Sequence, residues 1–529
     1  MYQPTDFTSQ HWQVTKPAAT GRRGMVASQS RAAAEAGLAI LEAGGSAADA
    51  AVGAAFALAV TEPWNSGLGG IGFTQVAKPG GAAETFDFGP VSPAGLDPAD
   101  FPTTGRWKQD LFAWPEVVGD RNIHGPMSFA IPSSVAGYAL LHERHGRLPA
   151  REMLAPAVAL ANRGLAQDWY TLLKVANAAS TLRLYPESAR IYLPNGLPPV
   201  PPYQGKPGFF RQGMLPATLE RLQHAGFRDF YEGDVAAAIA ADVREAGGIL
   251  SATDLAHCRA RVVPAVSVPW RGRTLHLSAG LTAAPTFRRV MALMETADWS
   301  GSAPGTAWHL AFAKAMQEAY AERLAGLGDG GPADTEPAGA DTCTTHLNVC
   351  DADGMMVSMT TTLLSSMGSR VVLPRSGVLM NNGVMWFDPQ PGSANAIGPN
   401  KRPLTNMSPL IVADAAGRPE MALGASGGRR ILAAVYQMLS LVSGFGLSPE
   451  EAAHFPRIDV SGPEGATADR RLPQATLDAL AAAGPLEVVE HAVLPVNFAC
   501  PNLILIGPDG TRTGITDVMS PWSAALAQS

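Results

Sequence analysis

The sequence predicts an α+β protein, because helical and strand patterns occupy separate stretches of the chain. Apolar residues recur with a helical period through most of residues 126–325. Residues 344–362 instead alternate as strands do, and the turn Asp351-Ala352-Asp353-Gly354 divides them into a hairpin. More alternating runs follow between residues 370 and 424. Such a grouping of helices and strands is typical of the α+β class.

Length and composition allow a large globular enzyme and disfavour some partners. The 529 residues suffice for several ordinary domains or one large core, and 46% of them are hydrophobic. The net charge is −7 without a basic block, so we expect no nucleic acid partner. The most apolar run, Ala47 to Val60, is interrupted by Asp49 and is too short to span a bilayer, so we expect no membrane partner.

The N-terminus and the cysteines predict a cytoplasmic location. Residues 1–24 contain no apolar segment of the signal-peptide kind. The cysteines (Cys258, Cys343, Cys350 and Cys500) have neither disulfide nor metal-site spacing, and the histidines are scattered. We therefore expect no metal and no cofactor.

The first elements are a short strand and two alanine-rich helices. The strand is expected at Met25–Ser28. Ser30 can cap a helix over 31–43 that Gly44-Gly45 ends, and Ser46 can cap a second helix over 47–60. Because alanine is small, both helices can pack close to a sheet.

The glycines at 67, 69 and 72 match G-x-G-x-x-G, which raises the question of a dinucleotide site. That fingerprint requires a strand before it and a helix after it. Here a helix precedes the glycines and a strand follows them. We therefore expect a tight turn with close backbone packing, and no nucleotide site.

The remaining elements follow in order along the chain. Expected helices are Ser134–His145, Pro149–Arg163, Leu215–Ala225, Gly233–Ala246, Thr306–Leu324 and Arg429–Gly444. Expected strands are a hairpin over Ala265–Ser278, then Arg370–Met380, Leu410–Asp414 and Met421–Gly424. Residues 328–343 and 388–400 are expected to be loops.

Thr344 begins its strand directly after a loop, and that position suits one particular chemistry. If the chain is cut before Thr344, the new α-amine has a pKa of about 7.7–8.0. Such an amine can act as general base for the hydroxyl of the same residue, which then becomes a nucleophile. On these residues alone, an ordinary β-branched residue at a strand start is the simpler interpretation.

Gly427 and Gly428 lie between an expected strand and the N-terminus of an expected helix. Free backbone N–H groups meet the positive end of a helix dipole at such a position. The pair can form an oxyanion site, or it can be only a strand-to-helix turn.

Taken together, these stretches resemble the gamma-glutamyltranspeptidase family of N-terminal-nucleophile hydrolases, as a divergent member. The segments that carry the resemblance are Gly44 to Ala50, Glu62 to Phe73, Pro132 to Gly137, Phe230 to Gly233, Gly247-Gly248, Tyr320-Ala-Glu-Arg323, Thr344 to Asp353, Lys401 to Pro409 and Gly424 to Ile431. The resemblance implies a four-layer αββα sandwich. Residues 1–343 and 344–529 would form it together as one intertwined structural domain.

The resemblance also implies self-cleavage between Cys343 and Thr344. A large subunit (1–343) and a small subunit (344–529) would stay together, with a dimer of such heterodimers as one option. Thr344 would be the nucleophile, and Thr362 matches a second threonine that orients it. Gly427 and Gly428 match the oxyanion pair. We assign His346 no catalytic role, since strand alternation turns it away from its neighbour.

The positions that would grip a glutamyl group depart from the family pattern. The family's arginine falls on Gly89, its asparagine on Leu364 and its acidic residue on Trp386. The candidate substrate-binding residues are Gly89, Leu364, Trp386, Thr405, Asn406 and Arg429, with Asp388 as an alternative grip. A site built on hydrogen bonds loses much of its affinity when their partners are missing.

The sequence therefore predicts a self-processing enzyme that acts on a small-molecule amide. It would cleave a gamma-glutamyl or related small acyl amide through an acyl-enzyme on Thr344, with water as the main acceptor. A specialised acylase of the oxamate or cephalosporin type is the alternative, because the recognition residues are replaced. An uncleaved, non-catalytic binding protein is the alternative from another class. The retained catalytic threonines and glycines argue against it.

Overall fold

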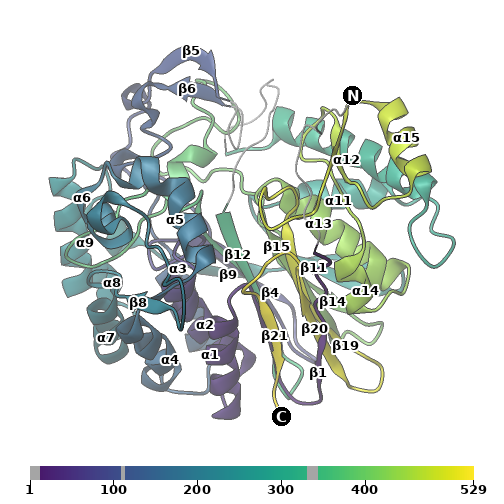
Figure 1. Cartoon of the computed structure of the whole chain (residues 1–529), viewed down its shortest axis with the longest axis horizontal. Helices are drawn as coiled ribbons and strands as arrows, with labels where there is room; N and C mark the ends of the chain where they lie inside the picture. Colours follow the sequence, from purple (N-terminus) through teal and green to yellow (C-terminus); the bar gives the residue numbers. More distant parts are fainter. Residues whose placement is uncertain (1–11, 109–113, 330–342) are drawn as a thin grey trace.

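The computed structural model describes residues 12–108, 114–329 and 343–529 and arranges them in four layers (Figure 1). In this part of the chain, two seven-stranded sheets face each other, and helices cover the outer face of each sheet. The α+β class and the four-layer αββα sandwich are thus confirmed.

The sheet that contains Thr344 has the strand order β21-β2-β12-β13-β3-β4-β9. In that order the strands are Ala524–Ala527, Met25–Ser28, Cys343–Cys350, Met356–Leu364, Ile71–Ala77, Glu84–Phe88 and Arg261–Pro264. All neighbours pair antiparallel. Strands from before and after Thr344 are therefore interleaved within one sheet, and β12 and β13 lie near its middle.

The second sheet has the order β1-β20-β19-β15-β14-β11-β10. Its strands are Ala19–Gly21, Arg512–Thr516, Cys500–Ile506, Pro419–Ser426, Leu410–Ala413, Arg273–Leu277 and Val266–Trp270. Smaller sheets contain β5 (Thr103–Trp107), β6 (Pro115–Val117), β7 (Leu165–Gln167), β8 (Gly208–Phe210), β16 (Ile458–Asp459), β17 (Ala466–Asp469) and β18 (Leu486–Val489).

The two helical layers come from different parts of the chain (Figure 1). Over the β12 sheet lie α1 (Arg31–Glu42), α2 (Ala47–Thr61), α3 (Ser134–His145), α4 (Ala150–Arg163), α5 (Trp169–Leu182), α6 (Pro186–Tyr192), α7 (Leu215–Ala225), α8 (Asp229–Glu232), α9 (Asp234–Glu245) and α10 (Ala252–His257). Over the β15 sheet lie α11 (Ala284–Leu293), α12 (Thr306–Gly326), α13 (Arg430–Leu439) with a π-helical turn at Ser440–Gly444, α14 (Pro449–His454) and α15 (Gln474–Ala483). Short 3₁₀ turns occur at Pro98–Asp100, Val118–Asp120, Pro126–Ser128, Pro194–Gly196 and Gly383–Trp386.

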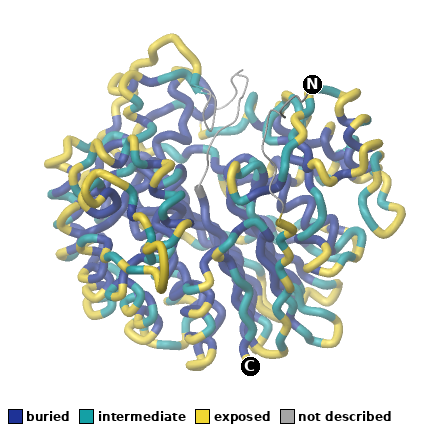
Figure 2. Tube along the Cα trace, in the orientation of Figure 1, coloured by how far each residue is buried: buried dark blue, intermediate teal, exposed yellow. Residues whose placement is uncertain are grey.

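The core fills the spaces between these layers, and the central strands are buried along most of their length (Figure 2). Helix α2 packs on β12 and is buried on every side except at its last residue, Thr61. That position explains its composition, because a helix buried on every side needs apolar side chains all round, and its many alanines let it pack closely. A narrower apolar layer that includes Met25, Ile411 and Ile504 separates the two sheets.

Most elements lie where the sequence predicts them. The predicted strand at 25–28, the hairpins at 265–278 and 344–362, and the helices at 134–145 and 215–225 are confirmed within a residue or two. Ser46 caps α2 in a reciprocal capping box with Asp49, as expected. Helix α2 precedes the glycine-rich turn and β3 follows it, and a Cβ at Gly69 would lie 2.3 Å from the Leu379 carbonyl oxygen, so the expected close packing is also confirmed.

Two local predictions are wrong. Ser30 precedes α1, but its side chain makes no capping hydrogen bond. Residues 370–380 do not form a strand, because the chain turns back at Gly377, which has a φ of 68° and donates its N–H to the Leu373 carbonyl. Helices α5, α6 and α11 were not expected. The predicted loop before Thr344 lies largely outside the described residues.

Among the described residues, no helix combines the length and the apolar character needed to cross a lipid bilayer.

Asp49 offers a test of how α2 is held. Its buried carboxylate accepts hydrogen bonds from the backbone N–H of Ser46, Arg147 and Leu148 at 2.9, 2.8 and 3.2 Å. Replacing Asp49 with Ala would leave these donors without a partner, so we expect the free energy of unfolding to fall by about 2–4 kcal/mol. Chemical denaturation would measure the loss. The matched control is Asp353→Ala, which removes an exposed aspartate that pairs with the Arg147 side chain and should cost no more than about 0.5 kcal/mol. Equal losses in the two variants would contradict this account of Asp49.

Candidate active site

Thr344 is buried at the start of β12, where a bulge interrupts its pairing with β13. Cys343 pairs with Leu364, whereas Thr345 pairs with Thr361, so β13 contains an extra residue at this point. Bulges of this kind redirect side chains next to active sites. Here the bulge brings the Thr344 hydroxyl within 3.4 Å of the Thr362 hydroxyl, the contact that the sequence comparison predicts for this pair.

Leu364 fixes the second threonine through its backbone. Its N–H donates to Thr362 Oγ1 at 2.8 Å. Its φ is +87°, in a region that an L-residue other than glycine or asparagine rarely adopts. Strained backbone is tolerated where the surrounding structure fixes it, and it concentrates at functional sites. The strained backbone at Leu364 thus places the N–H group that contacts the Thr362 hydroxyl.

His346 lies on the same strand face as Thr344, between the two sheets. Its ring contacts Thr360 Oγ1 at 2.9 Å and Asn348 Oδ1 at 3.2 Å. Gly424 of β15 leaves room for the ring, since a Cβ there would lie 2.2 Å from it. Burial lowers the pKa of His346 to about 3, so the ring is neutral. These contacts give the ring a structural part between the sheets.

Gly427 and Gly428 form the turn from β15 into α13. Their φ values are 136° and 59°, both in the region that favours glycine. Their carbonyl oxygens accept the N–H groups of Arg430 and Ile431 at 3.2 and 3.1 Å, which begins the helix. Ala499 packs tightly against it, because a Cβ at Gly427 would lie 2.7 Å from the Ala499 Cα.

Helix α12 holds two loops of the site in place. The Tyr320 hydroxyl donates to the Arg429 carbonyl oxygen. The buried Arg323 guanidinium donates to the Thr405 carbonyl oxygen at 2.6 Å and to Asn406 Oδ1 at 3.0 Å. Burial lowers the pKa of Arg323 to about 10, which leaves it charged at neutral pH. Sequence reasoning assigned these two residues no role, although Tyr320-Ala-Glu-Arg323 was among the segments that carried the resemblance.

A small pocket, with a free volume of about 30 Å³, brings several predicted substrate-binding residues together. Trp386, Asn406 and Arg429 line it, as does Asp388, whose pKa burial raises. Further lining residues are Trp114, Arg323, Leu324, Leu327, Ser393, Ala394, Asn395 and Leu404. The Arg429 guanidinium lies 5.9 Å from the centre of the Trp114 ring. Aromatic rings and guanidinium groups thus meet in one pocket.

Known proteins match this chain over most of its length. The family model for gamma-glutamyltranspeptidase matches residues 33–336 and 331–491. The chain belongs to the gamma-glutamyltranspeptidase family. A glutathione hydrolase proenzyme of Escherichia coli (strain K12) is 29% identical, over 94% of this chain and 91% of that protein. The acylase ACY 1 proenzyme of Pseudomonas sp. (strain V22) is 30% identical, over 96% and 93%.

Solved structures of similar proteins extend the match to the fold. The cephalosporin acylase from Bacillus halodurans has a TM-score of 0.85 over 100% of this chain and 99% of that chain, at 22% identity. The gamma-glutamyltranspeptidase of Helicobacter pylori, at 26% identity, has a TM-score of 0.50 and covers 61% of this chain and 86% of that chain. The protein is therefore an enzyme of the N-terminal-nucleophile hydrolase class, with glutathione hydrolases and acylases among its relatives.

The other predicted substrate-binding residues of this family member lie outside the pocket lining. Leu364 packs with Trp386, Phe73 and Met385 in an apolar cluster. A Cβ at Gly89 would lie 2.5 Å from the Phe73 ring, so a ring packs where the family's arginine would begin. The Thr405 hydroxyl donates to the Leu281 carbonyl at 2.9 Å.

Cys343 and Thr344 are consecutive residues of β12, and the side chain of Cys343 lies outside the described residues.

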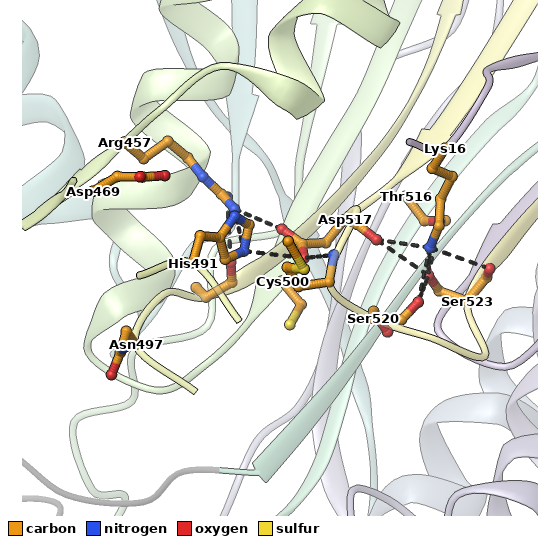
Figure 3. A network of polar contacts seen from close by, with 12 residues as sticks. Lys16, Arg457, Asp469, His491, Asn497, Cys500, Thr516, Asp517, Ser520 and Ser523 are labelled. Carbon is orange, nitrogen blue, oxygen red and sulfur yellow. Dashed lines mark hydrogen bonds and ion pairs between the residues drawn. The ribbon is translucent and has the colours of Figure 1, made fainter. Parts of the chain in front are cut away.

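Figure 3 shows a buried cluster of charged residues that sequence reasoning missed. Arg457 pairs with Asp517 at 2.6 Å and also donates to the Ala499 carbonyl oxygen at 3.3 Å. His491 lies 3.4 Å from Asp517. Burial alone would raise the pKa of Asp517, but the charges of His491 and Arg457 outweigh it and hold the pKa below its usual value. Because Ala499 packs on Gly427, this cluster supports the turn.

Lys16 ties the beginning of the described chain to the same region (Figure 3). Its ammonium donates to the carbonyl oxygens of Asp517 and Ser520, each at 2.8 Å, and to Ser523 Oγ at 2.6 Å. No spacing in the sequence links these residues, since Lys16 and Ser523 are separated by almost the whole chain.

Gly427 provides a test of the turn's geometry. In Gly427→Ala the new Cβ would collide with Ala499, and the residue would have to keep a φ of 136°, so the turn and its N–H groups should shift. We expect turnover to fall by about 10²–10³, the usual loss for one misplaced oxyanion donor. Gly417→Ala is the matched control, since Gly417 also has a positive φ of 76° but a Cβ there meets no atom within 4 Å. Steady-state kinetics on both folded variants would decide. Near-full activity of Gly427→Ala would place the oxyanion donors elsewhere.

Proposed function

We propose that this enzyme is a self-processing amidohydrolase whose nucleophile is Thr344. The observation that carries the proposal is the pair of buried hydroxyls, Thr344 and Thr362, which the bulge brings within 3.4 Å. Thr362 Oγ1 also accepts the Leu364 N–H, which holds in place the oxygen that accepts the Thr344 hydroxyl.

Self-processing needs only groups of the chain and water. The Thr344 hydroxyl adds to the carbonyl carbon of Cys343, its proton passes to the Thr344 nitrogen, and the peptide C–N bond breaks. The resulting ester between Cys343 and Thr344 Oγ1 is then hydrolysed by water. The products are a carboxylate on Cys343 and a free α-amine and hydroxyl on Thr344.

The processed Thr344 can then act on an amide substrate. Its α-amine takes the hydroxyl proton while Oγ1 attacks the acyl carbonyl carbon. The backbone N–H groups of Gly427 and Gly428 stabilise the oxyanion that forms. The amide C–N bond then breaks, and the amine of the substrate leaves with the proton that the α-amine of Thr344 had taken. Water attacks the acyl ester, which releases the acid and regenerates the threonine. Water is the main acceptor in this proposal.

The acyl group is a small one that need not be gamma-glutamyl. Where the family would place an arginine, an asparagine and an acidic residue, this chain has Gly89, Leu364 and Trp386. Leu364, Trp386 and Phe73 form an apolar cluster instead. That cluster favours an acylase with less polar recognition, and the acylase ACY 1 relatives agree with it. Arg429, together with Asn406 in the pocket lining, supplies the polar contacts that remain.

Three further expectations from the sequence remain part of this proposal. The large subunit (1–343) and the small subunit (344–529) stay associated after the cut. A dimer of such heterodimers and a cytoplasmic location stay predictions.

The first prediction here is self-cleavage at Thr344. Purified protein should give two bands on a denaturing gel, and sequencing of the smaller one should begin Thr-Thr-His-Leu-Asn. Thr344→Ala should remain one chain of 55.2 kDa, because it lacks the attacking hydroxyl. Thr345→Ala, one residue along, is the matched control and should still be cut. Normal cleavage of Thr344→Ala would rule out Thr344 as the processing nucleophile. An uncut, inactive wild type would favour the binding-protein alternative.

The second prediction concerns the acyl group. We compare p-nitroanilides of three acids of similar length: gamma-glutamyl, glutaryl, which lacks only the α-amine, and pentanoyl, which lacks the carboxylate too. The replaced positions offer the α-amine no partner, so kcat/KM should be higher for glutaryl than for gamma-glutamyl by about 10–10², the value of one charge-assisted hydrogen bond.

A variant extends this comparison to the carboxylate. Arg429→Gln should bring the glutaryl and pentanoyl rates together if Arg429 binds the carboxylate. Asp388→Asn is the matched control on the same pocket and should not reduce the glutaryl rate. A gamma-glutamyl compound that is the best substrate by a wide margin would show that our interpretation of Gly89, Leu364 and Trp386 is wrong.

A further inference from the structure

Glu62 is a buried carboxylate on the opposite face of the nucleophile's strand. It ends α2, is 3% exposed, and its Oε2 accepts the Thr345 hydroxyl at 2.9 Å. Thr345 directly follows the nucleophile, and strand alternation directs its side chain toward the helices while Thr344 faces the second sheet. Burial raises the pKa of Glu62 to about 7, so the fold keeps a carboxylate where its charge is costly.

The backbone around Glu62 fixes it relative to both threonines. The Leu363 N–H donates to the Asn65 carbonyl at 2.9 Å, and the Met367 N–H donates to the Trp64 carbonyl at 3.0 Å. These bonds join the turn after α2 to the end of β13, next to Thr362. Glu62 is therefore held on one side by this turn and on the other by Thr345.

Several described groups with a charge or a titratable proton lie near this carboxylate. From its own turn, Asn65 donates a hydrogen bond to it. From α5, Lys174 acts on it through its charge, and Tyr170, against whose ring Lys174 packs at 5.0 Å, lies beside it. From β19, Cys500 interacts with both Lys174 and Tyr170. Burial raises the pKa of Cys500 to about 12, so the thiol brings no charge at neutral pH.

We propose that Glu62 is a positioning residue that balances the α-ammonium group of Thr344 in the processed enzyme. This inference rests on the proposed function, because the amine exists only after the cut. A glutamine would accept the Thr345 hydroxyl equally well, so the hydrogen bond alone does not require a carboxylate. The cut creates a positive charge one residue from Thr345, in a buried site, and the carboxylate meets that need.

The consequence is a control on the pH at which the enzyme works. A carboxylate near an ammonium group favours the charged form of each, which raises the pKa of the amine and lowers that of the acid. Catalysis needs the neutral amine, so the acid limb of the kcat/KM profile reports its pKa in the free enzyme. Glu62 thus sets the lower pH limit of activity.

The experiment compares the pH profiles of kcat/KM for wild type and Glu62→Gln. Without the negative charge the amine loses its proton at lower pH, so we expect the acid limb of Glu62→Gln to move down by about one pH unit. Glu62→Asp keeps the charge and should stay within a few tenths of a unit of wild type. Glu84 is another carboxylate on the same sheet, and it pairs with Arg144 and His145 of α3. Glu84→Gln should not move the acid limb of the profile.

Each result decides the matter. Coincident acid limbs for wild type and Glu62→Gln overturn the inference, as does a Glu62→Gln protein that folds but stays uncut, because Glu62 would then act before the amine exists. If Glu62→Gln does not fold, Glu62→Asp decides: a limb shifted down by a unit or more overturns the inference. An uncut and inactive wild type would instead defeat the proposed function. A cut, active wild type with coincident limbs would defeat only the part assigned to Glu62.

Discussion

The pairing of β12 with β13 is the constraint on which the rest of this molecule depends. It lies near the middle of its sheet, with β2 beside one strand and β3 beside the other. The bulge at its end brings Thr344 and Thr362 together. The same two strands separate a face toward the second sheet, with His346 and Thr360, from a face toward the helices, with Thr345. The positions of Thr344 and Thr362 in the candidate site therefore depend on this pairing.

The sequence could predict this ladder because its signals are local. Alternation, a turn with Asp351 and Gly354, and a preceding loop lie within a few residues of one another. The alanines of α2 likewise predicted a helix pressed against a sheet, which is its observed place. Residues 370–380 also alternate, but Gly377 turns the chain back, and alternation cannot report the conformation of one glycine. Helix α5 was not predicted, yet it brings Tyr170 and Lys174 close to Glu62.

What could not be predicted are contacts between distant segments. Arg323 and Tyr320 were noticed only as part of a matching segment, and their partners at 405–406 and 429 are more than eighty residues away. Arg457, Asp517 and Lys16 were not noticed at all, because a buried ion cluster leaves no periodicity in the sequence. Glu62 stood inside a recognised segment, but its contact with Thr345 joins residues 283 positions apart. Such partners follow from the sheet order, which a single sequence does not contain.

The interleaved sheet also bears on what a cut before Thr344 would do. The pairs from Thr345 to Cys350 with β13, and from Leu347 to Cys350 with β2, all lie after the cut. A break between Cys343 and Thr344 would therefore remove one pair of the ladder, Cys343 with Leu364, and leave the others intact. Both sheets still contain strands from both halves, and Lys16 still joins the first half to the segment 517–523. The fold can thus release a new N-terminus at its centre without losing the packing that orients it, because the strand is held along its length and not by its end.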